Sequence, residues 1–82
     1  MAREENRLGY DARLEVSGKG YVIEEGCTRS ADACTAAFYA REAIRLCTDL
    51  NVLAFVRDND TCEMREVPAH TVGESFDRLL PV

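Results

Sequence analysis

Residues 8–25 read LGYDARLEVSGKGYVIEE, and their pattern is the clearest indication of structure in the chain. Between Leu8 and Val16, apolar residues alternate with glycine or charged residues. A period of two is typical of a strand with one buried face. Residues 17–20 then supply two glycines, which tolerate the positive φ of a tight turn. Residues 21–25 return to strand-forming types, so the stretch predicts a β-hairpin.

The residue pattern changes its period after Arg29. Alanine becomes abundant, and small or apolar residues recur at helical spacing. This stripe consists of Ala33, Ala36, Ala37, Ala40, Ala43, Ile44, Cys47 and Leu50. Ser30 and Asp32 are both candidate N-caps, because their side-chain oxygens can accept hydrogen bonds from free first-turn amides. We expect one long helix from Ser30 or Asp32 to about Leu50, with its alanine side against a sheet.

The second half of the chain returns to strand patterns. Residues 52–56, VLAFV, are an apolar run of the kind found in buried strands. Turn-forming residues occupy 57–60, and residues 61–67 alternate until Pro68 ends them. The predicted fold class is therefore α+β, with a single four-stranded sheet in the order strand-strand-helix-strand-strand and the helix packed on one face.

The chain of 82 residues is expected to form one domain, residues 1–82. Residues 1–7 are polar and are expected to be flexible. Residues 69–82 form a tail in which 74–80 can fold into a short helical turn.

The formal net charge of −5 opposes direct binding of nucleic acid, which needs clustered lysine and arginine. It favours a protein partner with a basic surface. No run approaches the ~20 apolar residues that cross a bilayer, so no membrane contact is expected. The opening residues lack the apolar core of a secretory signal. We therefore expect a cytoplasmic protein with free thiols at Cys27, Cys34, Cys47 and Cys62, and with Cys34 near the surface.

The pattern of potential catalytic and metal-binding residues is sparse. The cysteines contain no C-x-x-C motif, and His70 is the single histidine, so neither a metal site nor a cofactor is expected. A thiol enzyme that pairs one cysteine with His70 is an alternative, but no local motif selects the cysteine. The expectation is a protein that is not an enzyme.

The predicted helix offers one candidate contact surface. At 100° per residue, Ala40 lies at the centre of the apolar stripe and Phe38 on the opposite side. A helix against one sheet does not need large apolar residues all round. The surface comprises Phe38, Tyr39, Glu42 and Leu46. Its alternative is a fold in which the tail covers that side through Phe76, Leu79 and Leu80.

Acidic residues form a second candidate surface that could face a basic groove. They lie on the first strand, the last turn and the last strand: Asp11, Glu15, Asp58, Asp60 and Glu63. The alternative is a solvated sheet face with interspersed arginines.

Two resemblances suggest a class of function. Residues 20–28, GYVIEEGCT, followed by Ala33 to Cys47 with AREAI at 40–44, resemble the N-terminal module of HicB-type antitoxins. In that family a hairpin, a Gly-Cys turn and an alanine-rich helix block a small toxin nuclease. The resemblance implies a non-catalytic module, with homodimerisation through the helix or a free sheet edge as an alternative.

In size, acidity and strand-helix-strand order, the whole chain also resembles small phage anti-CRISPR proteins. Those proteins inhibit by binding a Cas subunit, often at a surface meant for nucleic acid. This resemblance carries over no residue. It implies a protein-binding inhibitor that acts by occlusion, and this is the leading expectation.

Overall fold

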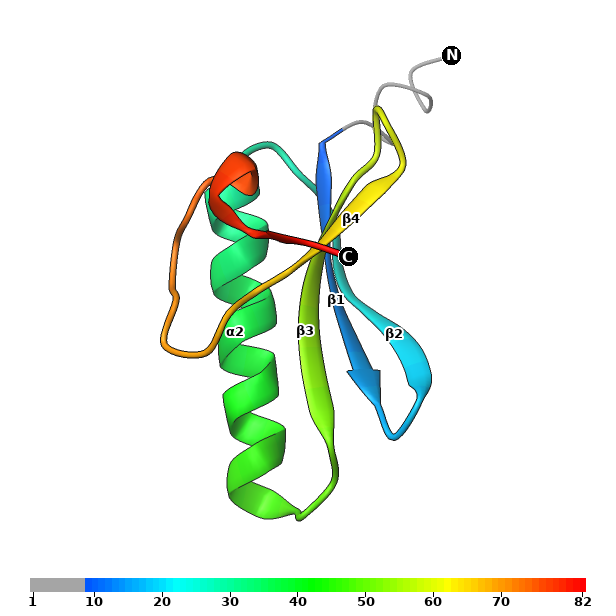
Figure 1. Cartoon of the computed structure of the whole chain (residues 1–82), viewed down its shortest axis with the longest axis vertical. Helices are drawn as coiled ribbons and strands as arrows, with labels where there is room; N and C mark the ends of the chain where they lie inside the picture. The colour runs from blue at the N-terminus through cyan, green and yellow to red at the C-terminus, as the bar shows by residue number, and fades with distance from the viewer. Residues whose placement is uncertain (1–8) are drawn as a thin grey trace.

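The computed structural model describes residues 9–82, which form a five-stranded antiparallel sheet with one long helix across one face (Figure 1). The strand order is β2-β1-β3-β4-β5. The elements are β1 (Tyr10–Val16), β2 (Lys19–Cys27), α2 (Ser30–Cys47), β3 (Val52–Asp58), β4 (Glu63–Glu66), a 3-10 turn η1 (Phe76–Arg78) and β5 (Leu80–Pro81). The helix and the mixed α+β class agree with the sequence-based expectation. The expected flexibility of 1–7 and a strand start at Leu8 concern residues outside those described.

The β1–β2 hairpin closes on a two-residue turn. Ser17 and Gly18 both have positive φ, 52° and 88°, which is the signature of a type I′ turn. Gly9, just before β1, also has positive φ, and a Cβ there would lie 2.5 Å from the carbonyl oxygen of Cys27. The backbone approach between Gly9 and the end of β2 therefore requires glycine.

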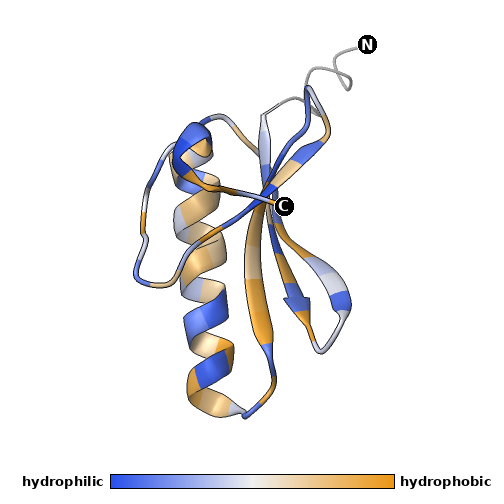
Figure 2. Cartoon of the chain, in the orientation of Figure 1, coloured by the Kyte–Doolittle hydropathy of each residue, from blue (hydrophilic) through white to orange (hydrophobic). Residues whose placement is uncertain are grey.

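The core lies between α2 and the two central strands. Alternate residues of β1 and β3 face the helix, as the period of two requires. The buried cluster from these elements comprises Ala12, Leu14, Val52, Ala54, Val56, Ala33, Cys34 and Ala37. Small residues at Ala33 and Ala37 let α2 lie close to the sheet. The hydrophobic colouring of β3 in Figure 2 reflects its central position.

The helix is rotated relative to the sequence-based expectation. Its buried residues are Ala33, Cys34, Ala37 and Arg41. The centre of the buried side is thus near Ala37 and not at Ala40, a rotation of about 60° around the helix axis. The expectation that Cys34 lies near the surface is wrong, because its side chain is fully buried.

The N-terminal cap of α2 also differs from the prediction. Arg29 occupies the cap position without a side-chain hydrogen bond, so neither Ser30 nor Asp32 caps the helix. The Ser30 hydroxyl instead accepts a hydrogen bond from the backbone N–H of Phe76, at 2.9 Å. The Ser30 side chain therefore holds the C-terminal tail.

The chain after β4, residues 67–82, is called the tail from here on, and it adds a strand that was not predicted from the sequence. Leu80 pairs with Glu66 and Pro81 with Arg65, so the sheet has five strands and not four. The short helical turn predicted within 74–80 is present as η1, whose Phe76 is buried. The Phe76 ring lies between Tyr10, with centroids 5.7 Å apart, and the Arg65 guanidinium, 4.8 Å from its centroid. None of the described helices has both the length and the apolar character needed to cross a membrane.

Candidate protein-binding surfaces

The side of α2 that points away from the sheet carries a second apolar stripe. Tyr39, Ala43 and Leu46 occupy positions i, i+4 and i+7, which share one helix face. The side chain of Tyr39 is 60% exposed and that of Leu46 is 86% exposed. Leu50, just beyond the helix end, is also exposed. We call Tyr39, Ala43 and Leu46 the outer stripe.

Phe38 does not belong to the outer stripe, which corrects its predicted position opposite the core. It is half-buried and packs against the core cluster. Its ring meets the Tyr39 ring edge-on, with centroids 5.3 Å apart. Because α2 is rotated, Phe38 packs against the side of Tyr39, and Tyr39 presents the exposed aromatic surface.

The tail covers the flank of α2 that carries Phe38. Gly73 lies near the Thr35 hydroxyl, and the carbonyls of Val67 and Pro68 bind Arg41. Figure 1 shows the segment after β4 running along the helix. Phe76 and Leu79 of the tail are buried, whereas Leu80 stays exposed. The sequence left two alternatives for this side of the helix, an exposed contact surface or a side covered by the tail. Phe38 lies on the side covered by the tail, whereas Tyr39 and Leu46 are exposed.

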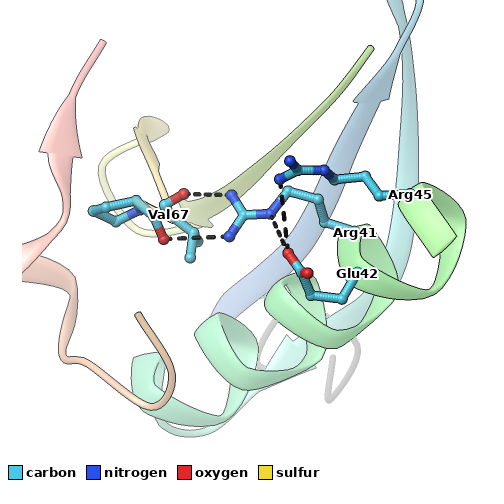
Figure 3. Close-up of polar contacts among 5 residues, drawn as sticks. Arg41, Glu42, Arg45 and Val67 are labelled. Atoms are coloured by element: carbon cyan, nitrogen blue, oxygen red, sulfur yellow. Dashed lines mark hydrogen bonds and ion pairs between the residues drawn. The ribbon is translucent and has the colours of Figure 1, made fainter. Parts of the chain in front are cut away.

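Arg41 links the helix to the tail, a role that the sequence analysis missed. Its side chain is 4% exposed and donates to the carbonyl oxygens of Val67 at 2.7 Å and Pro68 at 3.2 Å (Figure 3). Its Nε has no hydrogen-bond partner, but the Glu42 carboxylate lies 3.5 Å away and offsets the buried charge. Glu42 also lies 3.9 Å from Arg45. Glu42 thus acts within this network, at the margin of the outer stripe.

Four of the five predicted acidic residues gather at one end of the sheet. Asp58 lies opposite Glu63 on β4, and Asp60 follows in the turn between β3 and β4. Asp11 lies on β1 opposite Arg57 of β3. Figure 2 shows mostly hydrophilic colouring at this turn. Glu15 is separate, because it lies near the other end of β1, opposite Leu53.

Several of these carboxylates already have internal partners. Asp11 accepts hydrogen bonds from the backbone N–H of Gly26 and from the Asn59 amide. Asp58 accepts from the N–H of Asp60, and Glu63 pairs with Arg65 at 2.8 Å. Asp11 and Asp58 therefore shape the turn, and Asp60 is the most available of the four for an external contact.

Among residues 9–82, the four thiols divide into a buried pair and an exposed pair. Cys27 and Cys34 are buried, and Cys47 and Cys62 are exposed. Burial raises the pKa of the Cys27 thiol, and the nearby carboxylates of Glu24, Asp32 and Asp11 raise it further. A raised pKa leaves less thiolate, which is the nucleophilic form.

The described residues likewise bring together no group of three His, Cys, Asp or Glu side chains that could hold a metal ion. His70 is exposed, and its backbone has a positive φ of 67°. Within the described part of the chain, no hydrogen bond joins it to a cysteine.

A shallow cavity of about 540 Å³ lies between the end of α2, the start of β3 and the segment after β4. Its charged lining residues are Arg41, Arg45, Asp49 and Glu66. Two positive and two negative groups give the cavity no net charge to select an ion. Arg41 already donates to the tail carbonyls, so the cavity is best explained as a gap beside that contact.

Comparison of the chain with protein-family models, with curated proteins and with solved structures gave no match.

Proposed function

We propose that this chain is a non-catalytic protein-binding inhibitor that covers a nucleic-acid-binding surface of another protein. The observation that carries the proposal is the outer stripe. Tyr39 and Leu46 project from α2 on the side opposite the core, at spacing i and i+7. Amphipathic helices use such spacing when they dock into apolar grooves. Tyrosine is also enriched among residues that anchor protein interfaces.

The outer stripe is held rigid before any partner arrives. Ala33 and Ala37 fix α2 against the sheet, and Arg41 fixes it to the tail. The Phe38 ring supports Tyr39 from the side. A rigid surface loses little conformational entropy on binding, which increases affinity for a given contact area.

The charge of the chain indicates the kind of partner. A net charge of −5 attracts basic proteins and speeds their encounter. Asp60 and Glu63 are exposed at the acidic end of the sheet and can contribute to this steering. Surfaces that bind nucleic acid are basic, so they match this charge. The specific form we propose is a phage-encoded anti-CRISPR-type protein, with a Cas subunit as partner in the host cytoplasm.

The test is affinity capture from the host, with mass spectrometry, using wild type and three charge variants. Tyr39→Lys and Leu46→Lys place a charge in the outer stripe. Leu80→Lys makes the same chemical change at a 47% exposed position on β5 and serves as the control. We expect wild type and Leu80→Lys to capture the same nucleic-acid-binding protein. The stripe variants should bind it at least about tenfold more weakly, the effect of losing one anchor residue.

Retention of the captured protein by all four forms, or capture of no nucleic-acid-binding protein, would contradict the proposal. Circular dichroism of each variant separates lost binding from lost folding.

An antitoxin-like module is the second candidate. It is favoured by the arrangement of the β1–β2 hairpin, Gly26-Cys27 and α2, which are the three parts of the HicB-type resemblance. In that case the captured protein would be a small nuclease, and adding the chain would suppress its RNA cleavage.

A further inference from the structure

Strand β2 is an exposed edge of the sheet. It lies outermost in the strand order, and seven of its nine residues are exposed. Tyr21, Val22 and Ile23 are between 42% and 48% exposed, although such residues are usually buried in strands. Among the described residues, nothing pairs with the outer side of this strand.

The turn determines which backbone groups of β2 face outward. A two-residue type I′ turn closes on a hydrogen-bonded pair, here Val16 and Lys19. Hydrogen-bonded and non-hydrogen-bonded pairs alternate along an antiparallel ladder. Tyr21, opposite Leu14, is therefore bonded to β1. Gly20 and Val22 are in non-hydrogen-bonded pairs, so their N–H and C=O groups point to the free edge.

A β-bulge limits how much of this edge can pair. The register with β1 shifts between the pairs Arg13–Val22 and Ala12–Glu24, which leaves Ile23 as an extra residue. A bulge interrupts the regular ladder and protects an edge from extended pairing. The free segment suited to pairing is thus the short stretch from Lys19 to Val22.

The opposite edge of the sheet cannot pair with β2 of another copy, so copies cannot join head to tail into an open assembly. This edge is formed by β5, which has only two residues, Leu80 and Pro81. Proline has no N–H to donate, and it blocks pairing at sheet edges. The same strand of a second copy remains as the complementary partner, and such a contact closes after two chains.

We propose that two copies of this chain form a dimer through antiparallel pairing of their β2 strands, centred on Tyr21. In this register Gly20 lies opposite Val22 of the second copy, so each outward N–H meets an outward C=O. Tyr21 lies opposite its own equivalent in a non-hydrogen-bonded pair, where side chains are closest. The dimer leaves the outer stripe free and does not depend on the proposed inhibitory function.

Charge also fits this register. Lys19, the only lysine in the chain, comes at the end of the paired stretch, near the bulge residue Ile23 and the exposed Glu24 of the second copy. Directly opposed like charges are absent from the paired stretch, and such charges would destabilise it. Backbone hydrogen bonds and apolar contacts are not screened by salt. The dimer should therefore persist at high ionic strength, unlike an encounter that is steered by charge.

The test uses sedimentation equilibrium of Tyr21→Lys, Tyr21→Glu and their equal mixture. Wild type should show twice the 9.2 kDa mass of one chain. Each variant alone should be monomeric, because like charges face each other across the two-fold axis. The mixture should regain the dimer, since lysine then faces glutamate. Tyr39→Lys, on the outer stripe, should stay dimeric and is the matched control.

Far-UV circular dichroism is the control for folding, and each Tyr21 variant should be folded because Tyr21 is 48% exposed. A second variant, Val22→Pro, removes an outward N–H that β1 does not use. It should be folded and monomeric. A monomeric wild type throughout the concentration series, or a mixture of the two Tyr21 variants that stays monomeric, would overturn the proposed dimer.

Discussion

Arg41 shows how a single side chain can join two parts of this small fold. It is the one charged residue buried among residues 9–82, and it lies within the core-facing side of α2. Its guanidinium binds two tail carbonyls and lies 5.4 Å from the centroid of the Phe38 ring. An arginine can do this because it offers several donors in a fixed planar arrangement.

Replacing Arg41 with leucine should destabilise the fold. The carbonyls of Val67 and Pro68 lose their donors, and hydrogen bonds to charged groups contribute about 1.5–3 kcal/mol each. We expect Arg41→Leu to lower the free energy of unfolding by about 2–4 kcal/mol in urea titrations. Arg45→Leu makes the same chemical change at a 55% exposed side chain and should cost less than about 0.5 kcal/mol. Equal effects of the two substitutions would show that the tail contact contributes nothing.

The burial of Arg41 also explains why the sequence-based prediction placed Phe38 on the wrong side of the helix. A pattern of apolar and polar residues assigns arginine to the solvent side, and this moved the predicted stripe toward Ala40. The observed buried side includes Arg41 because its charge is satisfied by carbonyls some 26 residues away in the chain. Such a long-range partner has no local signal. Tyr39 and Leu46 were correctly predicted to lie outside the core, because both are far around the helix from Ala40, the predicted centre of the buried side, and from Ala37, the observed one.

At the scale of elements, α2 has two differently used sides. Ala33 and Ala37 belong to the core cluster shared with β1 and β3, whereas Tyr39, Ala43 and Leu46 of the outer stripe are exposed. Alternation predicted β1 and β4, and runs of strand-forming or apolar residues predicted β2 and β3. The residue pattern could not predict β5, because a stretch of two residues is too short to show alternation and Pro81 disfavours a strand. That strand forms because the tail is held at Ser30 and Arg41.

Phe76 should be the main apolar anchor of the tail. It is 9% exposed and contacts Tyr10 and Arg65. Phe76→Ala should lower the free energy of unfolding by about 3 kcal/mol, the usual cost of removing a buried ring. In hydrogen exchange, amides of residues 76–80 should lose protection before those of β1 and β3. Leu80→Ala, at an exposed position of the same tail, is the control; an equal loss of protection there would argue against this role for Phe76.

At the scale of the whole molecule, the fold presents three separate surfaces. The outer stripe lies on the helix side, the β2 edge lies at one margin of the sheet, and the acidic turn lies at the end of β3 and β4. A β2-centred dimer would carry two outer stripes and a net charge of −10, which is twice the −5 of one chain. Two linked sites bind a repeating or dimeric target more tightly than one.

Occlusion of a nucleic-acid-binding surface by this protein can be measured by competition. The captured protein is titrated with a fluorescent nucleic acid in the presence of increasing amounts of the chain. We expect stoichiometric displacement of the nucleic acid by wild type and by Leu80→Lys, and at least about tenfold weaker displacement by Leu46→Lys. A stable ternary complex, in which chain and nucleic acid bind together, would contradict the account.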